Sequence, residues 1–477
     1  MRNVDSVTGL PDAWFAGLHR LRNALANDQT ASRAAAVCWA LTRLILVIQV
    51  VAGHSYADPE FYQYAGLFAT GHWPYTNFPV EYPPLAMVFI LAPALPLLLF
   101  KRIAPLPDPG FTGTFTHLPT ADPVRYGAYA IVFATMILAV DAATTRMVWT
   151  GARRFIASDP TGAWSAMTYI WLIFLNGALL QKFDLVAGTL VLIAVLSFAN
   201  HHQKTAWAAL ALATLVKGYP ILAVPFFAIL TVYDTRPECT WNERLRRLVP
   251  GVVSFSAVIA AFTGIVLLFA GFRPIVETVL YHADRGTEVE SIFANLMMLV
   301  SWLPGLAAHT VFHQADLSRN ITSLLDPWVA PFAYTMLALT LAASYVGALK
   351  YFRAYYGTNS GHTITVQRLL VPACAVFLAF MLSFRALPLH YFLGILPLIA
   401  LVRLPSQRLH AIWLLSIILT QLAGQFVVSF WHNLVVLQPA TVALLTVRNS
   451  AWTVAFFILL VALWRKIYVP GRLRQVE

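Results

Sequence analysis

Apolar runs recur along nearly the whole chain, and they constrain its fold more than any other feature. The thirteen runs lie near residues 34–52, 84–100, 125–149, 163–180, 185–200, 205–232, 248–272, 291–303, 328–349, 367–384, 388–402, 409–430 and 451–464. A membrane-spanning helix needs about 20 apolar residues, and only 11% of this chain is charged, against roughly a quarter in soluble domains. The sequence predicts an all-α polytopic integral membrane protein with roughly 11–13 membrane helices.

The polar segments are short and lie mainly at the ends of the chain. Residues 1–33 carry four arginines, and the stretch GLPDAWFAGLHRLRNALAN within them has an amphipathic pattern that suits a membrane surface. We expect a cytoplasmic N-terminal segment over 1–33, a single transmembrane domain over 34–468 and a cytoplasmic tail over 469–477. The three cysteines lie far apart, so we expect neither a disulfide framework nor a cysteine metal site.

The net charge of +11 is explained by basic loops on the cytoplasmic face of a membrane, and we expect no nucleic-acid partner. With the N-terminus placed inside, 21 of the 32 lysines and arginines fall on the inner side. This topology predicts a multi-pass protein of the plasma (inner) membrane with both termini in the cytoplasm. The polar and aromatic segments 54–83, 181–184, 281–291 and 384–392 then lie on the outer side.

Two apolar runs are irregular. Run 84–100 contains Pro93 and Pro96, and we expect it to dip into the membrane and return. Run 205–232 is basic on both flanks and is interrupted by the sequence KGYP at 217–220. It is either a re-entrant hairpin, which is tolerated where backbone lines a cavity, or an ordinary span beside one misplaced basic loop.

The first outer loop combines acids with aromatic rings. Residues 54–83 contain Asp58, Glu60 and Glu81 and no lysine or arginine. A carboxylate in such a loop can take a proton from a hydroxyl nucleophile, although Asp58 equally suits the cap of a helix. The neighbouring aromatic residues, which include Tyr62 and Tyr82, suit a membrane interface or the stacking of sugar rings.

Two cations are candidates for binding a phosphate. Arg285, in the polar segment YHADRGTEVES, carries a planar guanidinium that matches phosphate, and His282 in the same segment is positioned to assist it. Glu288 and Glu290 either clamp Arg285 or bind hydroxyl groups. Lys217 lies inside an apolar run, where a charge is costly and by default marks a functional site, with snorkelling as the alternative.

The remaining candidates have a structural alternative as well. Asp184 either caps a helix or contacts substrate, whereas Arg43 and Asp141 are expected to form an ion pair between helices. The segments that hold the other candidates supply Gln181, Lys182, Tyr219, Arg385 and His390. The sequence contains no Walker loop, no HExxH and no dinucleotide-type glycine pattern, which disfavours a hydrolase or an ATP-driven pump.

Five segments together resemble a known family. An aspartate in the first outer loop resembles the catalytic residue of the GT-C superfamily of membrane glycosyltransferases. The runs DPEFYQYAGLFATGHWPY…EYPPL, LLQKFDLVAGTLVLIAVL, ALATLVKGYPILAVPFF and YHADRGTEVES resemble motifs of glycosyltransferase family 87, and SFRALPLHYFLGILPL resembles a late motif of that family more weakly. In the late motif Leu387 and His390 replace a serine and a glutamine.

The resemblance implies a GT-C-like helical bundle and an inverting hexosyltransferase. The donor is a polyprenyl-phosphate sugar, with mannose favoured, and the acceptor is a lipid-linked or cell-envelope glycan on the outer face. Asp58 is implied as the general base. The residues implied for the donor phosphate are Arg285, Lys217, Arg385 and His282. Those implied for the sugar or acceptor are Glu60, Glu81, Tyr62, Tyr82, Gln181, Lys182, Asp184, Tyr219, Glu290 and His390.

We expect no cofactor; a divalent metal held by Glu60 and Glu81 is the less favoured alternative to hydroxyl binding. The partners are the lipid-linked donor, the acceptor and membrane lipids. Two rival functions are a polytopic lipid or sugar transporter (flippase), which also uses charges and broken helices at membrane depth, and a structural membrane scaffold.

Overall fold

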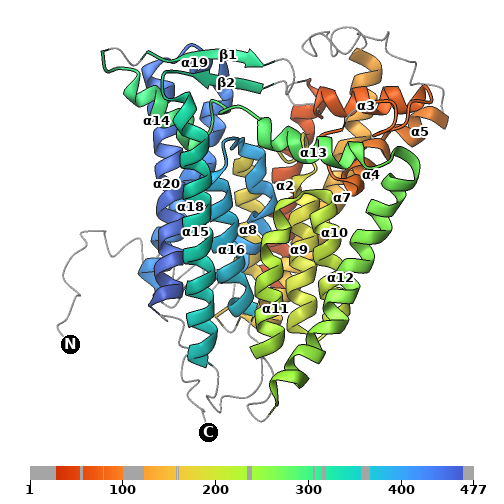
Figure 1. Ribbon diagram of the computed structural model, residues 1–477, viewed down its shortest axis with the longest axis vertical. Helices are drawn as coiled ribbons and strands as arrows, with labels where there is room; N and C mark the ends of the chain where they lie inside the picture. Colours follow the sequence, from red (N-terminus) through yellow and green to blue (C-terminus); the bar gives the residue numbers. More distant parts are fainter. Residues whose placement is uncertain are drawn as a thin grey trace.

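The computed structural model describes residues 28–53, 57–78, 80–99, 123–156, 158–159, 161–233, 239–304, 307–313, 318–355, 366–404 and 406–465. These residues form helices and one β-hairpin (Figure 1). The long helices are α2 (Asp28–Val51), α7 (Pro123–Phe155), α12 (Trp241–Ala270), α15 (Asp326–Tyr355), α16 (Val366–Ser383), α18 (Gln407–Ser429) and α20 (Pro439–Trp464). The helices of intermediate length are α3 (Pro59–Ala69), α8 (Ala163–Asn176), α9 (Asp184–Ala199), α10 (Gln203–Val216), α11 (Val224–Tyr233), α13 (Arg273–Asp284) and α14 (Ile292–Val300). The shortest are α4 (Pro84–Leu91), α5 (Ala94–Leu99), η2 (Tyr219–Ala223), η3 (Leu389–Gly394), α17 (Leu396–Leu401) and α19 (Trp431–Val435).

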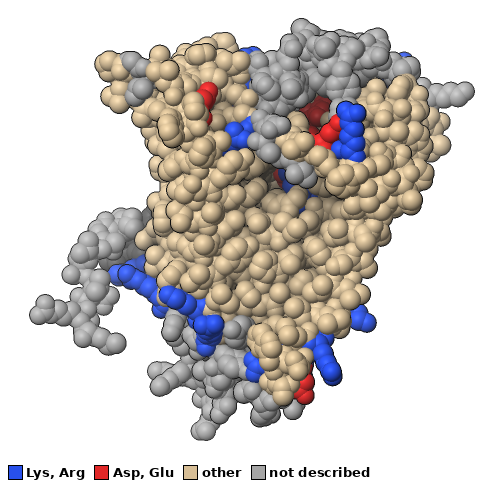
Figure 2. Space-filling model, viewed as in Figure 1, with Lys and Arg blue, Asp and Glu red and all other residues tan. Residues whose placement is uncertain are grey.

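Within the described residues, seven helices are long and apolar enough to cross a membrane. Their surface fits a lipid environment, because the middle of the molecule in Figure 2 shows no acidic or basic side chains, whereas lysines and arginines gather at its lower end. On α12, for example, Leu268 and Phe269 are 84% and 79% exposed, which suits contact with lipid tails. The prediction of an all-helical polytopic membrane protein is therefore confirmed in these terms.

The number of membrane helices stays a prediction, because proline and glycine divide several apolar runs into pieces that are short for a span. Run 84–100 forms α4 and α5, and run 388–402 forms η3 and α17. Run 291–303 gives only the nine-residue α14. Three further apolar helices have 10–17 residues. Of the predicted N-terminal segment 1–33, residues 28–33 form the start of α2 and the others lie outside the described residues, as does the predicted tail 469–477.

The run that contains KGYP is broken where the sequence predicted. Helix α10 ends at Val216, Lys217 has an extended backbone (φ −149°, ψ 128°), and the chain continues as η2 and α11. Lys217 lies beside Asp184, the first residue of α9, so α10 returns to the end of the bundle where α9 begins. The chain then leaves that end again through α11, as Figure 1 shows. Run 205–232 is therefore two helical parts joined at KGYP and not one continuous helix, and its re-entrant placement in a membrane stays a prediction.

The end of the bundle at which Asp184 and Lys217 lie, at the top of Figure 1, is covered by short elements. They are α3, α4, α5, α13, α14, α19 and the hairpin of β1 (His309–His313) and β2 (Ser318–Thr322). The strands are antiparallel with His309 opposite Thr322. Residues 287–289 run beside β2, because Val289 N–H donates to the Arg319 carbonyl and Ile321 N–H donates to the Thr287 carbonyl. This hairpin was not predicted from the sequence.

The expected ion pair between Arg43 and Asp141 is confirmed. The two side chains join α2 to α7, with Arg43 Nε 2.8 Å from Asp141 Oδ2 and Arg43 Nη2 2.9 Å from Asp141 Oδ1. The hydroxyl of Tyr169 and the indole N–H of Trp39 also donate to this carboxylate. Because the buried charges satisfy one another, the cluster is structural and holds the helices in register.

Candidate functional site

Asp58 lies at the start of α3 and is fixed by its neighbours. It is the N-cap residue, its Oδ1 accepts from the Glu60 N–H at 3.1 Å, and Pro59 occupies the first helical position, the preferred pattern for beginning a helix. The backbone N–H of Asp58 donates to the Gln181 carbonyl, and Oδ2 is in ion-pair contact with Lys182 Nζ. Both the cap and the active-site interpretations of Asp58 are therefore compatible with its geometry.

The other two acids of the first loop lie close to Asp58 but in different surroundings. Glu60 accepts from the Tyr64 hydroxyl at 2.5 Å, and burial raises the pKa of Glu60 well above its usual value, with the charges of Glu81 and Asp58 acting in the same direction. The Glu81 carboxylate accepts hydrogen bonds from the hydroxyls of Tyr82 and Tyr281. The environment thus favours the protonated form of Glu60 and separates its role from that of Asp58.

Lys217 reaches the site from the break after α10. Its Nζ is 2.8 Å from Asp184 Oδ1, and the two side chains are 15% and 1% exposed. The ammonium also lies 4.6 Å from the centre of the Tyr391 ring and 5.5 Å from that of Phe183. The N-cap position of α9 is Phe183, without a side-chain cap bond, so Asp184 serves Lys217 as a counter-ion and does not cap α9.

Arg285 reaches the site from the C-terminal end of α13. Its Nη2 contacts Glu288 Oε1, and both side chains are about nine-tenths buried. Helix α13 is attached to the first loop, because the Thr278 hydroxyl donates to the Val80 carbonyl at 3.0 Å and Tyr281 is bonded to Glu81. Of the two roles considered for Glu288, the structure shows the clamp on Arg285.

His390 lies where these charges meet. Burial, and then the positive charges of Lys182, Lys217 and Arg285, lower the pKa of His390 well below its usual value, so its imidazole is neutral at physiological pH. The three ion pairs therefore lie within electrostatic range of the uncharged His390 side chain; they are Lys182–Asp58, Lys217–Asp184 and Arg285–Glu288. Figure 2 shows the surface hollowed beside α13, with acidic and basic atoms visible in its depth.

Several predicted residues lie elsewhere or serve the fold. Tyr62 is 1% exposed and packs between Tyr126 and Tyr129, so we no longer expect it to touch a substrate; it is a core residue because it faces the inside of α3. Tyr219 is 8% exposed and packs on Phe377.

Three further candidates lie on the segments around α13 and η3. Glu290 pairs with Arg448 rather than with Arg285. The carbonyl of Arg385 accepts from the Glu288 N–H at 3.0 Å, and the Arg385 guanidinium lies 5.9 Å from the Tyr334 ring centre. His282 belongs to α13, but its side chain lies outside the described part of the structure.

Two residues near the site were missed. Tyr391 lies under Lys217, and Arg448 on α20 donates to Glu290 Oε1 at 2.9 Å and to the carbonyls of Glu290 and Leu387 at 2.7 and 2.8 Å. Arg448 thus joins the segment that carries Arg285 to the segment that carries His390. Arg448 lies between the apolar runs 409–430 and 451–464, so the signal that identified Lys217, a charge inside an apolar run, did not single it out.

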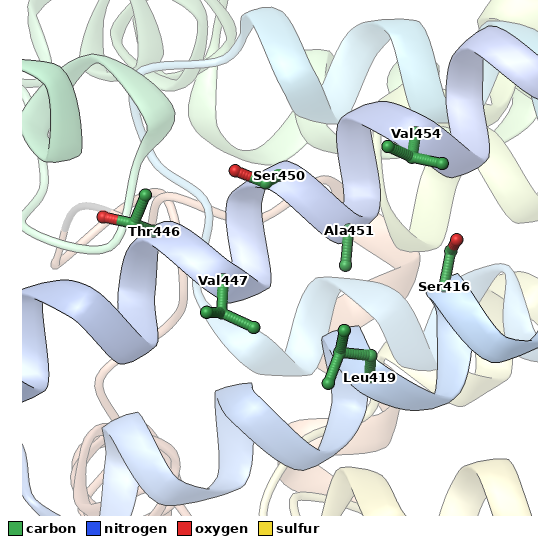
Figure 3. A pocket seen from close by; sticks show the side chains of 7 residues that line it. All are labelled: Ser416, Leu419, Thr446, Val447, Ser450, Ala451 and Val454. Carbon is green, nitrogen blue, oxygen red and sulfur yellow. The ribbon is translucent and has the colours of Figure 1, made fainter.

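A separate cavity of about 360 Å³ lies between α18 and α20 (Figure 3). It is lined by Ser416, Thr446 and Ser450 with Leu419, Val447 and Val454. It contains no charged or titratable side chain, and none of the predicted site residues reaches it. Across the described residues, no group of three His, Cys, Asp or Glu side chains is placed to hold a metal ion.

In comparisons with known proteins, no family model matches the chain, and no curated protein does either. The resemblance to glycosyltransferase family 87 therefore rests on the sequence motifs. The structural observation that bears on those motifs is their convergence: the segments around Asp58, Lys182, Lys217, Arg285 and His390 come from separate parts of the chain and meet at one end of the bundle.

Proposed function

We propose that this protein is an inverting membrane glycosyltransferase that moves a hexose, with mannose favoured, from a polyprenyl-phosphate donor to a lipid-linked or cell-envelope glycan. The observation that carries the proposal is the convergence of one fixed carboxylate, Asp58, with three cations at one end of an apolar bundle. A donor that is already activated on a lipid requires no nucleotide site. We place this end on the outer face of the plasma membrane; the lysines and arginines at the opposite end of the bundle support that orientation through the positive-inside rule.

The chemistry assigns one group to each developing charge. The Asp58 carboxylate takes the proton of the acceptor hydroxyl, and the oxygen forms its bond to the anomeric carbon. On the opposite face of the sugar, the bond from that carbon to the phosphate oxygen breaks, and its electron pair leaves with the phosphate. Arg285 and Lys217 stabilise the negative charge that develops there. Configuration at the anomeric carbon inverts because attack and departure occur on opposite faces.

Asp58 is a better candidate for the general base than its neighbour Glu60. The raised pKa of Glu60 favours its protonated form, in which it binds a sugar hydroxyl but accepts no proton. Asp58 is 20% exposed on its side chain, so an acceptor can approach it. Each of the three cations already has a carboxylate partner, so the empty site is nearly neutral in charge and stable without ligand.

The substitution Asp58→Asn tests the proposal. Asparagine keeps the cap of α3 but cannot accept the proton, so transfer of radiolabelled mannose from polyprenyl-phosphate mannose should fall by about two orders of magnitude or more. Binding of the donor should persist. The matched control is Glu277→Gln on α13, an exposed acid paired with Arg273, which should transfer at the wild-type rate.

Two results separate the alternatives. Near-normal transfer by Asp58→Asn contradicts the role of Asp58 as base. Absence of transfer by the wild-type protein, combined with movement of the labelled lipid across a vesicle membrane, supports a transporter instead.

A further inference from the structure

Lys182 forms an ion pair with Asp58, the proposed base, in the ligand-free protein. Its ammonium is in ion-pair contact with Asp58 Oδ2, and the other oxygen of the carboxylate accepts from the Glu60 N–H. An adjacent cation stabilises the charged carboxylate and thereby weakens it as a base. In the resting geometry both carboxylate oxygens of Asp58 are therefore engaged, and the proposed reaction requires that the contact with Lys182 changes so that an acceptor hydroxyl can reach the carboxylate.

The two partners differ in their freedom to move. Asp58 is fixed by its cap bond and by the bond from its backbone N–H to the Gln181 carbonyl. Lys182 has a long side chain that is 19% exposed, and its contacts within the described residues are Asp58 and the Phe61 ring, 5.4 Å from the ammonium to the ring centre. Lys217 is more firmly held, because three aromatic rings lie within 5.8 Å of its ammonium in addition to Asp184.

Lys182 also lies within electrostatic reach of the place where an anion would bind. Its charge acts on His390 together with those of Lys217 and Arg285. We infer that Lys182 is an exchangeable counter-ion, which pairs with Asp58 in the empty site and transfers to the phosphate of the bound lipid-linked donor, freeing Asp58 to act as the base. This inference rests on the function proposed above. It makes Lys182 a positioning residue that couples donor binding to activation of the base.

Other groups around Asp58 act in the opposite direction or stay uncharged. Glu60 and Glu81 are acids in the same cluster. Tyr82 on the first loop and Tyr129 on α7 lie within electrostatic range of Asp58, and the Tyr129 hydroxyl donates to the Ile90 carbonyl at 2.7 Å. Within the described residues, Lys182 is the cation in ion-pair contact with this carboxylate. Its departure would leave Asp58 Oδ2 without a cation partner among those residues.

The test measures protonation of Asp58 without relying on catalysis. The full-length protein in nanodiscs is treated with a carbodiimide and an amine, which label protonated carboxyls, and labelling at Asp58 is followed against pH by mass spectrometry. Saturating polyprenyl phosphate, which has no sugar to transfer, should raise the pH midpoint of labelling by about one unit or more. Lys182→Met should raise the midpoint equally without lipid, and added lipid should change it no further.

Two variants control for the substitution itself. Lys182→Arg keeps the charge and should restore the wild-type midpoint in the absence of lipid. Lys350→Met removes a cation that lies 3.8 Å from the Trp464 ring, away from the site, and should leave the midpoint unchanged.

Binding of radiolabelled polyprenyl phosphate is measured on the same samples. Bound lipid that leaves the wild-type midpoint unmoved overturns the exchange, and so does a Lys182→Met midpoint equal to that of the wild type. If polyprenyl phosphate does not bind, the proposed function fails and the exchange fails with it. The binding measurement thus distinguishes failure of the exchange alone from failure of both.

Discussion

Replacing Arg448 with methionine should destabilise the protein in a way that depends on pH. Arg448 is fully buried on α20 and donates to the Glu290 carboxylate and to two carbonyl oxygens. Burial raises the pKa of Glu290 to about 7, even though Arg448 acts to lower it. Because the folded-state pKa exceeds the ordinary carboxyl value, the folded protein binds more protons than the unfolded chain between pH 4.5 and 7, and stability falls as pH rises through that range.

The magnitude has two parts. The carbonyls of Glu290 and Leu387 lose their donor at every pH, which costs roughly 1–3 kcal/mol for each buried group. Without Arg448, Glu290 stays protonated in the folded protein to a higher pH. Above pH 7 each further pH unit therefore costs about 1.4 kcal/mol more in the variant than in the wild type. The difference in free energy of unfolding between the two proteins should thus be about 3 kcal/mol larger at pH 9 than at pH 6.

The assay is unfolding by SDS in detergent micelles, followed by tryptophan fluorescence at both pH values. The double variant Arg448→Met, Glu290→Gln should lose the pH-dependent part and keep the rest, because glutamine does not ionise. An equal destabilisation of the single variant at pH 6 and pH 9 refutes the reasoning. So does a double variant with the same pH dependence as the single one.

Two further predictions follow from local geometry. Alanine at Gly188 on α9 would place its Cβ 2.3 Å from the carbonyl oxygen of Gly394, so Gly188→Ala should destabilise the protein by about 1–3 kcal/mol, measured as a lower melting temperature. Gly264→Ala, where nothing lies within 4 Å of the added carbon, should leave that temperature unchanged or slightly higher, and equal melting of the two variants would contradict the argument. For topology, Asn77→Cys should react with an impermeant maleimide in intact cells and Asn242→Cys should not, both in a background without the three native cysteines; the reverse pattern would invert the proposed orientation.

The sequence was sufficient to predict the elements whose signals are local. The apolar runs identified the long helices, and an isolated charge in such a run identified the cluster around Lys217. The capping alternative for Asp58 matches the beginning of α3, and the KGYP sequence located the break after α10. In each case the physical cause acts within a few residues, so a pattern in one short segment is enough.

The features that depend on distant contacts could not be predicted. Nothing near Glu290 indicates that its partner is Arg448, more than 150 residues later in the chain. The assignment of Lys182 to Asp58 instead of to Asp184, two residues away in sequence, depends on how the loop at 181–184 meets α3. The burial of Tyr62 could not be predicted, because an aromatic residue has the same appearance in the sequence whether its ring faces the site or the core.

The double use of Asp58, as the first-turn cap of α3 and as the proposed base, limits how this position can be engineered. An alanine variant would lose the cap bond as well as the base, so an inactive product would not show which loss was responsible. Asparagine alone among close replacements keeps the size and the acceptor oxygen while removing the ability to hold a proton. A protein prepared in that form should remain assembled with both substrates side by side, which makes it the natural starting material for trapping the complete complex.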